Sequence, residues 1–205
     1  MGFKLGNTNI SELYVGSNKI SQAYLGSNLV YQASVPGPSF DEVTIGNQTW
    51  MAKNLAIDDG GTGITIKENV TANGVNFGNQ YYYNWNAAVR VANSIEGWHL
   101  PSVNEWNTLA LTVGGPHFQD VGTKLKSTTG WTYGNGTDDY GFTGFPVGLI
   151  YSGSFMALGQ DIMFWTSNEN SSNATYKELN PNSGLYGDSI DKSMLYCSVR
   201  LVKDI

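Results

Sequence analysis

The stretch GWHLPSVNEWNTLALTVGG, residues 97–115, contains the clearest helix signal in the chain. Ser102 predicts an N-cap, and Glu105 completes an S-x-x-E capping box, in which each of the two residues bonds to the backbone N–H of the other. The Gly-Gly pair at 114–115 predicts the end of the helix. One face of the predicted helix is apolar at helical spacing: Trp106, Leu109 and Val113.

The residues around this helix predict a mixed α+β domain. FDEVTIGNQTWMAKNL (40–55) indicates a β-hairpin turning at Gly46-Asn47, and residues 56–79, rich in Gly, Asn and Thr, indicate a loop. A second helix is predicted in QYYYNWNAAVRVA (80–92), with an apolar stripe of Tyr82, Trp85, Val89 and Ala92. From residue 130 onward only strands and loops are expected. The predicted strands are GFTGFPVGLIY (141–151), DIMFWTS (161–167), ATYKEL (174–179) and SVRLVKDI (198–205).

A decapeptide repeat precedes this domain. LGNTNISELYVGSNKISQAYLGSNLVYQ (5–32) contains three copies, each combining a Gly-Asn or Gly-Ser turn with about six residues of strand character. We expect three or four short strands within residues 1–34, in a meander or a small solenoid. The repeat is either a lid packed on the main domain or, as we favour, a docking and assembly module. Residues 35–39, with two prolines around a glycine, predict the linker to a domain at 40–205.

The composition excludes several classes of function. With 11 Lys and Arg against 17 Asp and Glu, the net charge is -6, so nucleic acid is not an expected partner. One cysteine in 205 residues excludes an internal disulfide. The start MGFKLGNTNIS has no apolar core, so we expect no signal peptide in this chain, and no apolar run predicts membrane insertion.

The few reactive side chains form no catalytic pattern. His99 and His117 lack metal-ligand spacing, and His99, just before the predicted helix, is expected to hold that turn in place. Cys197 lies in a strand-like stretch and predicts a buried thiol. We therefore expect no catalytic residue, no metal, no cofactor and no enzymatic activity.

Two carboxylate doublets leave narrower alternatives open. Neither Asp58-Asp59 nor Asp138-Asp139 forms a dyad by itself, because adjacent residues on a strand point to opposite faces. Asp138-Asp139 is expected to cap a turn, with a bound cation as the alternative. A polysaccharide hydrolase using Asp138 or Asp139 is the enzyme alternative.

Seven blocks follow one another along the chain: TIGNQTWMAKNL (44–55), YYYNWNAA (81–88), GWHLPSVNEWNTL (97–109), GTKLKSTTGW (122–131), DDYGFTGFPVG (138–148), FWTSNE (164–169) and SVRLVKD (198–204). In this order they are similar to the Fibrobacter succinogenes major paralogous domain of Bacteroidetes and their phages. The resemblance covers residues 40–205 and implies a C-type lectin-like fold, with two helices and antiparallel strands. The tryptophans in these blocks, Trp50, Trp98, Trp106, Trp131 and Trp165, are expected in the core, and Arg200 is expected to pair with a carboxylate.

Two relatives of that fold have different activities. The formylglycine-generating enzyme needs two cysteines, which excludes that activity here. The other relatives are variable proteins diversified by retroelements, including phage receptor-binding proteins, in which a C-terminal segment forms the ligand-binding face. The calcium-dependent sugar signatures Glu-Pro-Asn and Trp-Asn-Asp of animal lectins are missing from this sequence.

The resemblance implies a variable binding surface within residues 168–196, rich in Asn, Ser and Tyr as binding surfaces often are. The alternative is that these are ordinary loop residues with turn chemistry. Exposed side by side, Met194 and Leu195 would extend such a patch. The expected ligand-binding residues are Asn168, Glu169, Asn170, Thr175, Lys177, Asn180, Pro181, Asn182, Ser183, Leu185, Tyr186, Asp188, Ser189, Asp191, Met194 and Tyr196.

The expected function is therefore non-enzymatic ligand binding. The resemblance implies a phage or prophage tail adhesin, located on a virion, that recognises a bacterial surface protein or glycan. Residues 1–34 would join it to tail or particle proteins, with homo-oligomers an option. The alternatives are a Bacteroidetes cell-surface adhesin whose leader was removed and a structural particle protein without a ligand.

Overall fold

The structure is a computed structural model that describes the chain in segments. Before residue 33 it describes the backbone of six short strands. Side chains are described for residues 39–58, 65–114, 120–182 and 184–204. The chain divides into two compact units, residues 1–39 and 40–205. Several predictions concern residues outside the described ones: the linker at 35–38, Asp59, His117 and Ser183.

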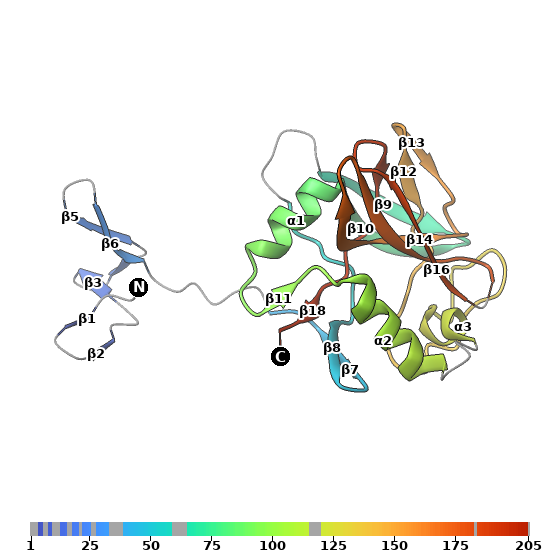
Figure 1. Ribbon diagram of the computed structural model, residues 1–205, viewed down its shortest axis with the longest axis horizontal. Coiled ribbons are helices and arrows are strands. Elements are labelled where there is room, and N and C mark those ends of the chain that lie inside the picture. Colours follow the sequence, from blue (N-terminus) through green and yellow to red (C-terminus); the bar gives the residue numbers. More distant parts are fainter. Residues whose placement is uncertain are drawn as a thin grey trace. The chain divides into compact units, whose positions relative to one another are not determined.

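The decapeptide repeat forms three antiparallel strand pairs (Figure 1). The sequence predicted three or four short strands. The structure instead has six described strands, because a strand lies on each side of every Gly-containing turn of the repeat. The docking or lid role of this unit stays a prediction. The pairs are β1 (Lys4–Leu5) with β2 (Thr8–Asn9), β3 (Leu13–Val15) with β4 (Asn18–Ile20), and β5 (Gln22–Leu25) with β6 (Asn28–Gln32).

The second unit opens with the predicted hairpin, β7 (Glu42–Ile45) and β8 (Gln48–Met51). Gly46 in its turn has a φ of +64°, which glycine adopts without strain. β18 (Val202–Lys203) pairs with β8 and with β11 (Trp98–His99), so the sheet order is β11-β18-β8-β7. This pairing joins the end of the domain to its beginning.

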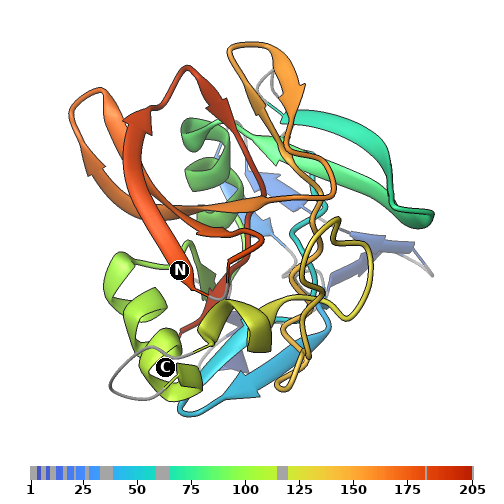
Figure 2. The ribbon, with the colours of Figure 1, turned by 90° about the vertical axis from the view of Figure 1, so that its right-hand side faces the viewer.

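Residues 65–83 form a long antiparallel hairpin, β9 (Thr65–Ala72) and β10 (Val75–Tyr83), coloured teal in Figure 2. The predictions of a loop over 56–79 and of a helix that includes Tyr82 are wrong for these residues. The strand pattern is obscured in the sequence because the register shifts between Asn76 and Gly78, which is a bulge. Tyr82 is buried in β10 and donates its hydroxyl to the Val147 carbonyl at 2.5 Å.

The helix predicted in residues 80–92 begins later than expected. α1 (Trp85–Asn93) starts after Asn84, whose side-chain oxygen accepts the Ala87 N–H at 2.9 Å. Of the predicted stripe, Trp85 and Ala92 are buried, whereas Val89 is only half-buried. The buried face instead includes small residues, which let α1 approach the strands closely.

α2 (Val103–Gly114) confirms the predicted capping box. Ser102 Oγ accepts the Glu105 N–H at 3.2 Å, and the Glu105 carboxylate accepts the Ser102 N–H at 2.7 Å. Its predicted apolar face is buried. A third helix, α3 (Val121–Leu125), was not predicted, because five residues are too short to show helical periodicity.

Two three-stranded antiparallel sheets follow α3, and the β12–β13 hairpin and the β14–β16 sheet project from the same side of the domain (Figures 1 and 2). The strands predicted at 161–167 and 174–179 are confirmed. The strands predicted at 141–151 and 198–205 are shorter in the structure, where they cover only residues 149–151 and 202–203. Three glycines and a proline interrupt the first of them. The sheets are β13 (Ser154–Met156), β12 (Leu149–Tyr151) and β17 (Leu195–Tyr196), then β14 (Ile162–Asn170), β15 (Asn173–Leu179) and β16 (Leu185–Asp191).

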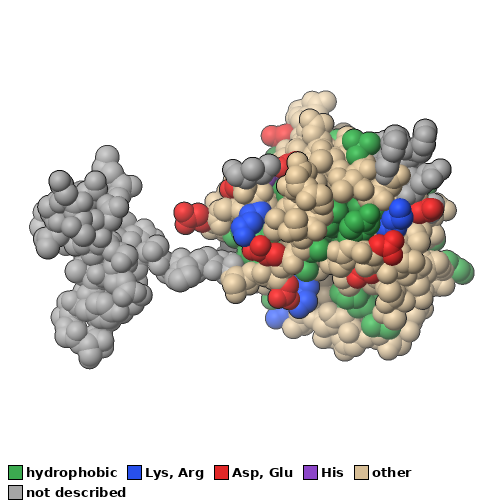
Figure 3. Space-filling view, turned by 90° about the horizontal axis from the view of Figure 1, so that it is seen from below, with side chains coloured by type: hydrophobic (Ala, Val, Ile, Leu, Met, Phe, Trp, Pro, Cys, Tyr) green, Lys and Arg blue, Asp and Glu red, His purple; other side chains and the backbone are tan. Residues whose placement is uncertain are grey.

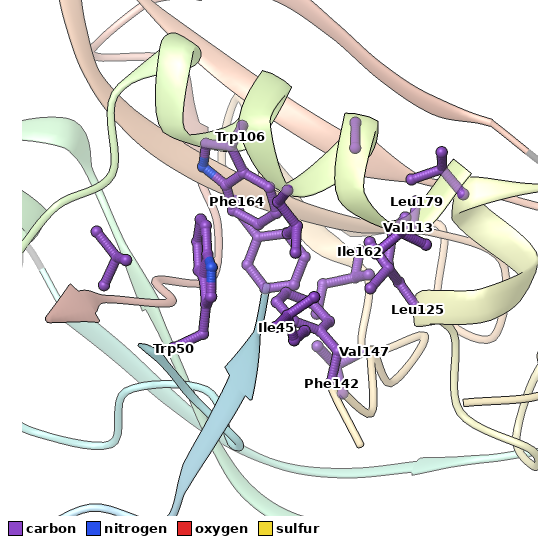
Figure 4. Close-up of a cluster of buried hydrophobic side chains, with 14 of the residues drawn as sticks. Ile45, Trp50, Trp106, Val113, Leu125, Phe142, Val147, Ile162, Phe164 and Leu179 are labelled. Carbon is purple, nitrogen blue, oxygen red and sulfur yellow. The ribbon is translucent and has the colours of Figure 1, made fainter. Parts of the chain in front are cut away.

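The buried side chains form two hydrophobic clusters. In the first, the Trp106 ring from α2 lies 4.8 Å from Trp50 and 5.3 Å from Phe164, centroid to centroid (Figure 4). The predicted mixed class of helices with mostly antiparallel strands is thus confirmed. So is the core position of the five block tryptophans, none more than 8% exposed: Trp50, Trp98, Trp106, Trp131 and Trp165.

Arg200 is fully buried, and no carboxylate of the described residues pairs with it, so that prediction is wrong. Its guanidinium donates to the carbonyls of Met51 and Phe142 and to the side chain of Asn54. Burial lowers the pKa of Arg200 to about 9, with a small opposing effect of the Asp138 carboxylate. The side chain therefore stays charged at neutral pH, and main-chain oxygens replace the expected ion pair.

His99 ties the start of α2 to the end of the chain, which confirms its predicted structural role. Nε2 lies 2.6 Å from Glu105 Oε1, and Nδ1 lies 2.6 Å from Asp204 Oδ1. Burial would lower the pKa of His99, but the hydrogen bonds and charges of these two carboxylates outweigh it and raise the pKa. The imidazolium thus holds two distant segments together.

We expect this contact to make stability depend on pH. Because the folded state raises the pKa of His99, the contribution is complete below the unfolded value of 6.5 and is lost as pH rises through the folded value. The side chain is 38% exposed, so solvent screening limits the contribution to about 1 kcal/mol or less. Urea unfolding across that window should show the loss in the native protein and not in His99→Gln; an equal slope in both would contradict the assignment.

Candidate ligand-binding surface

Most of the predicted binding residues lie on the sheet β14-β15-β16, in which β16 is the edge strand. Trp165 is opposite Tyr176, which is opposite Asp188. Phe164 is likewise opposite Lys177. Since opposed residues of antiparallel strands point to the same side, the register sorts these side chains into two faces.

One face lies against α2, and we call it the α2 face. Lys177 Nζ donates to Asn107 Oδ1 on α2 at 3.3 Å, and Leu179 is buried in the first core cluster. A Cβ at Gly187 would lie 2.9 Å from Cδ of Lys177, so this glycine leaves room for the lysine stem. Burial lowers the pKa of Lys177. Among the predicted residues, the register brings Thr175, Lys177, Leu185 and Ser189 to this face.

The opposite face carries Tyr176, Glu178, Tyr186 and Asp188, and we call it the Tyr176 face. Tyr186 is 47% exposed, and Tyr176 is half-buried against the second core cluster. Burial raises the pKa of Tyr176, and the carboxylates of Glu178 and Asp188 raise it further. Two tyrosines and two carboxylates therefore form one amphipathic surface on a regular sheet.

A further carboxylate lies beside the Tyr176 face. Burial raises the pKa of Asp161, just before β14, to about 6, and the charge of Glu178 adds to the effect. Glu178 Oε1 accepts a hydrogen bond from the Asn180 side chain at 3.0 Å, which fixes its position. Negative charge is thus concentrated on this side of the sheet. On the face shown in Figure 3, the charged side chains of the described residues are scattered.

Several predicted binding residues make structural hydrogen bonds. Asn168 Oδ1 accepts the Val103 N–H at the start of α2 at 2.7 Å. Glu169 pairs with Lys192, whose ammonium also lies 4.4 Å from the centre of the Trp85 ring. At these positions the contacts agree with the alternative prediction, in which the side chains stabilise local structure and do not form a binding surface.

Asp191 and Asn180 also make hydrogen bonds that stabilise turns. The Asp191 carboxylate accepts the N–H of Ser193 at 2.8 Å and its hydroxyl at 2.6 Å, and these hydrogen bonds lower its pKa. Asn180 Oδ1 accepts the N–H of Asn182 at 3.0 Å. Both side chains shape the ends of β16 rather than its exposed surface.

A buried lysine supports the loop between β15 and β16. Lys126 is 1% exposed, and its Nζ donates to the Asn180 carbonyl at 3.1 Å, with the carbonyls of Pro181 and Asn182 at 3.5 Å. The ammonium also lies 4.8 Å from the centre of the Trp131 ring. Burial lowers the pKa of Lys126. The loop is therefore anchored from within the domain.

Met194 and Leu195 are not exposed side by side, so they do not extend a binding patch. Leu195 is 1% exposed and lies in the second core cluster, opposite Tyr151 in the β12–β17 pair, while Met194 is half-buried. Cys197, two residues after Leu195, is fully buried, as predicted, and burial raises the pKa of its thiol well above the usual range. The chain thus returns to the core immediately after the turn that follows β16.

The structure does not unite the fifteen predicted residues that it describes in one surface. By register, Tyr186, Asp188 and Glu169, which is opposite Ala174, lie on the side of the Tyr176 face. The sequence reasoning missed the other members of this face, Tyr176 and Glu178. The sequence NATYKEL (173–179) could have shown them, because every second residue of a strand points to the same face. Ala174, Tyr176 and Glu178 therefore share one face. Four others lie on the α2 face, and Ser183 lies outside the described residues. The rest lie at the end of β14 (Asn168, Asn170), in the loop after β15 (Asn180, Pro181, Asn182), or beyond the exposed part of β16 (Asp191, Met194, Tyr196).

Two further observations concern chemistry outside the sheet. Asp138, at φ +50°, accepts the N–H and the hydroxyl of Thr143 at 2.7 Å each, so it caps a turn as expected. Among the residues described, His, Cys, Asp and Glu nowhere form a group of three that could hold a metal ion. In the same part of the chain, no helix is long and apolar enough to cross a membrane.

The fold and this surface define a mixed α/β domain with a lateral antiparallel sheet. Residues 43–203 match the family model described as Fibrobacter succinogenes major domain. The match spans most of the chain, so the protein belongs to this family. No curated protein and no solved structure shows a significant match.

Proposed function

We propose that this protein is a non-enzymatic ligand-binding protein that recognises its partner with the Tyr176 face. One observation carries the proposal: none of the seven residues of β16 is buried, although the neighbouring strands are anchored in the core. β16 is also an edge strand, with β15 as its one partner among the described strands. Its exposed side chains can therefore differ widely between relatives without loss of the fold.

The residue types on this face suit recognition. Tyr176 and Tyr186 supply large, rigid contact area, and Glu178 and Asp188 supply hydrogen-bond acceptors at its edge. In our proposal the fold is C-type lectin-like, and a retroelement diversifies residues 168–196. The decapeptide unit attaches the domain to a phage or prophage tail, or to another particle.

The proposed ligand is a bacterial surface protein or glycan. Multivalent display on a particle would strengthen weak individual contacts. A Bacteroidetes cell-surface adhesin remains the alternative setting, and the upstream gene sequence distinguishes the two: a signal peptide before Met1 would favour the cell surface. A near-copy of the coding region for 168–205, differing at adenines and next to a reverse transcriptase gene, would support diversification.

We expect the double variant Tyr186→Ala with Asp188→Ala to bind intact Bacteroidetes cells about tenfold or more weakly than the native protein. Both side chains are exposed, so the free energy of unfolding should change by only about 0.5 kcal/mol. Flow cytometry with the fluorescently labelled full chain over a panel of strains measures the binding.

Leu111→Ala is the matched control. Leu111 is 48% exposed, close to the value for Tyr186, but lies on α2, on the other side of the sheet. It should leave binding unchanged. Native-like binding by the double variant, or an equal loss in the control, would refute recognition by the Tyr176 face.

A further inference from the structure

A groove lies between β9 and the β12–β13 hairpin, outside the Tyr176 face. It consists of two hollows of about 400 and 450 Å³ that share Glu68 and Phe155 in their linings. Volumes in this range are typical of small-molecule sites. Ile66 and Ile150 form apolar parts of the second hollow. We call this feature the β9 groove.

An exposed aromatic ring lies where the two hollows meet. Phe155 lies on β13, an edge strand, and its large apolar side chain is 43% exposed. Its ring packs edge-on against the buried Tyr82 ring, at 5.6 Å between centroids and an interplanar angle of 83°. That packing holds Phe155 in place as a flat apolar platform.

Three polar side chains surround this platform. Glu68, Ser152 and Tyr196 line the second hollow. Within the described residues, none of the three side chains makes a hydrogen bond or an ion pair. Glu68 lines both hollows, and burial together with the Glu68 carboxylate raises the pKa of Tyr82, the residue on which Phe155 packs. The groove thus presents one acceptor group and two hydroxyls beside an aromatic face.

We propose that the β9 groove binds a neutral oligosaccharide, with one sugar ring on Phe155 and its hydroxyls bonded to Glu68, Ser152 and Tyr196. A sugar ring has an apolar face of C–H groups and a rim of hydroxyls, which matches this arrangement. An apolar peptide side chain would cover the three polar groups without bonding them, which is unfavourable. A cationic ligand would use Glu68 and the rings but leave the hydroxyls of Ser152 and Tyr196 without acceptors.

The groove is separate from the proposed recognition surface, and the inference does not rest on that function. Of the sixteen predicted binding residues, only Tyr196 lines it. Most of its lining comes from β9 and the β12–β13 hairpin, before residue 168. Variation within 168–196 would therefore reach the groove only through Ser193 and Tyr196.

The test is a titration of the ¹⁵N-labelled full chain with cellotriose, maltotriose and chitotriose, followed by NMR. We expect at least one of them to shift the amide signals of residues 66–71 and 150–156, with a Kd in the millimolar range. Phe155→Ala should weaken that binding about tenfold or more, because the platform is lost. Tyr196→Phe keeps the ring and removes one hydroxyl, and should weaken binding by about fivefold.

Met156→Ala is the control variant. Met156 is 49% exposed on the same strand, but its side chain does not line either hollow. It should bind like the native protein, as should the double variant of the Tyr176 face. The proposal is overturned if no trisaccharide shifts the groove signals, if both Phe155→Ala and Tyr196→Phe bind normally, or if spermine shifts them and the sugars do not.

Discussion

Replacing Arg200 with methionine is expected to lower the free energy of unfolding by about 3–5 kcal/mol. The guanidinium bonds to the carbonyls of Met51 and Phe142 and to the side chain of Asn54, three segments that are distant in sequence. Methionine fills similar space but leaves these buried acceptors unpaired, and each unpaired group costs about 1–3 kcal/mol. Arg200 also lies 4.4 Å from the centre of the Phe142 ring, a contact that would be lost.

Urea unfolding monitored by tryptophan fluorescence measures this loss. Arg200→Lys keeps the charge but cannot reach the same acceptors, so it should recover only part of the stability. Lys53→Met is the control, because Lys53 is paired with Asp41 on the surface with a side chain 73% exposed, and it should cost less than about 1 kcal/mol. If Arg200→Met proved as stable as the control, the proposed role of Arg200 as a buried cross-link would be wrong.

The contrast between Arg200 and α2 explains what the sequence could predict. The capping box of α2 depends on Ser102 and Glu105, three positions apart, so local chemistry was sufficient to predict it. Two of the three partners of Arg200 are backbone carbonyl groups 58 and 149 positions away, and backbone carbonyls leave no mark in the side-chain sequence. The sequence therefore predicted a carboxylate partner for Arg200 and could not show these main-chain acceptors.

The candidate surface was predicted as a region rather than as a face. Residues 168–196 were identified from the family resemblance, supported by their Asn, Ser and Tyr content, and neither separates exposed side chains from those that cap turns. Strand register decides this difference, and it places Tyr186 on one side and Lys177 on the other. The β9 groove could not be foreseen at all, because a bulge and several glycines and asparagines made residues 56–79 resemble a loop.

Replacing Trp106 with alanine is expected to destabilise the domain by about 3–5 kcal/mol, a large part of the roughly 5–15 kcal/mol that stabilises a typical domain. Trp106 is fully buried, and its ring contacts those of Trp50, Phe142 and Phe164 at 4.8, 5.9 and 5.3 Å between centroids. These three rings come from β8, from the loop before β12 and from β14. Truncation therefore leaves a cavity where α2 meets two sheets (Figure 4).

The matched variant Trp106→Phe should be much less harmful, at about 2 kcal/mol or less. The indole N–H of Trp106 is buried without a hydrogen-bond partner among the described residues, which is itself unfavourable. Phenylalanine removes that N–H and keeps an aromatic ring against Trp50. Tyr133→Ala, at a side chain 66% exposed, should change stability by no more than about 0.5 kcal/mol. Urea unfolding of all three variants tests the ranking, and a Trp106→Phe as unstable as Trp106→Ala would mean that the indole N–H has a stabilising partner.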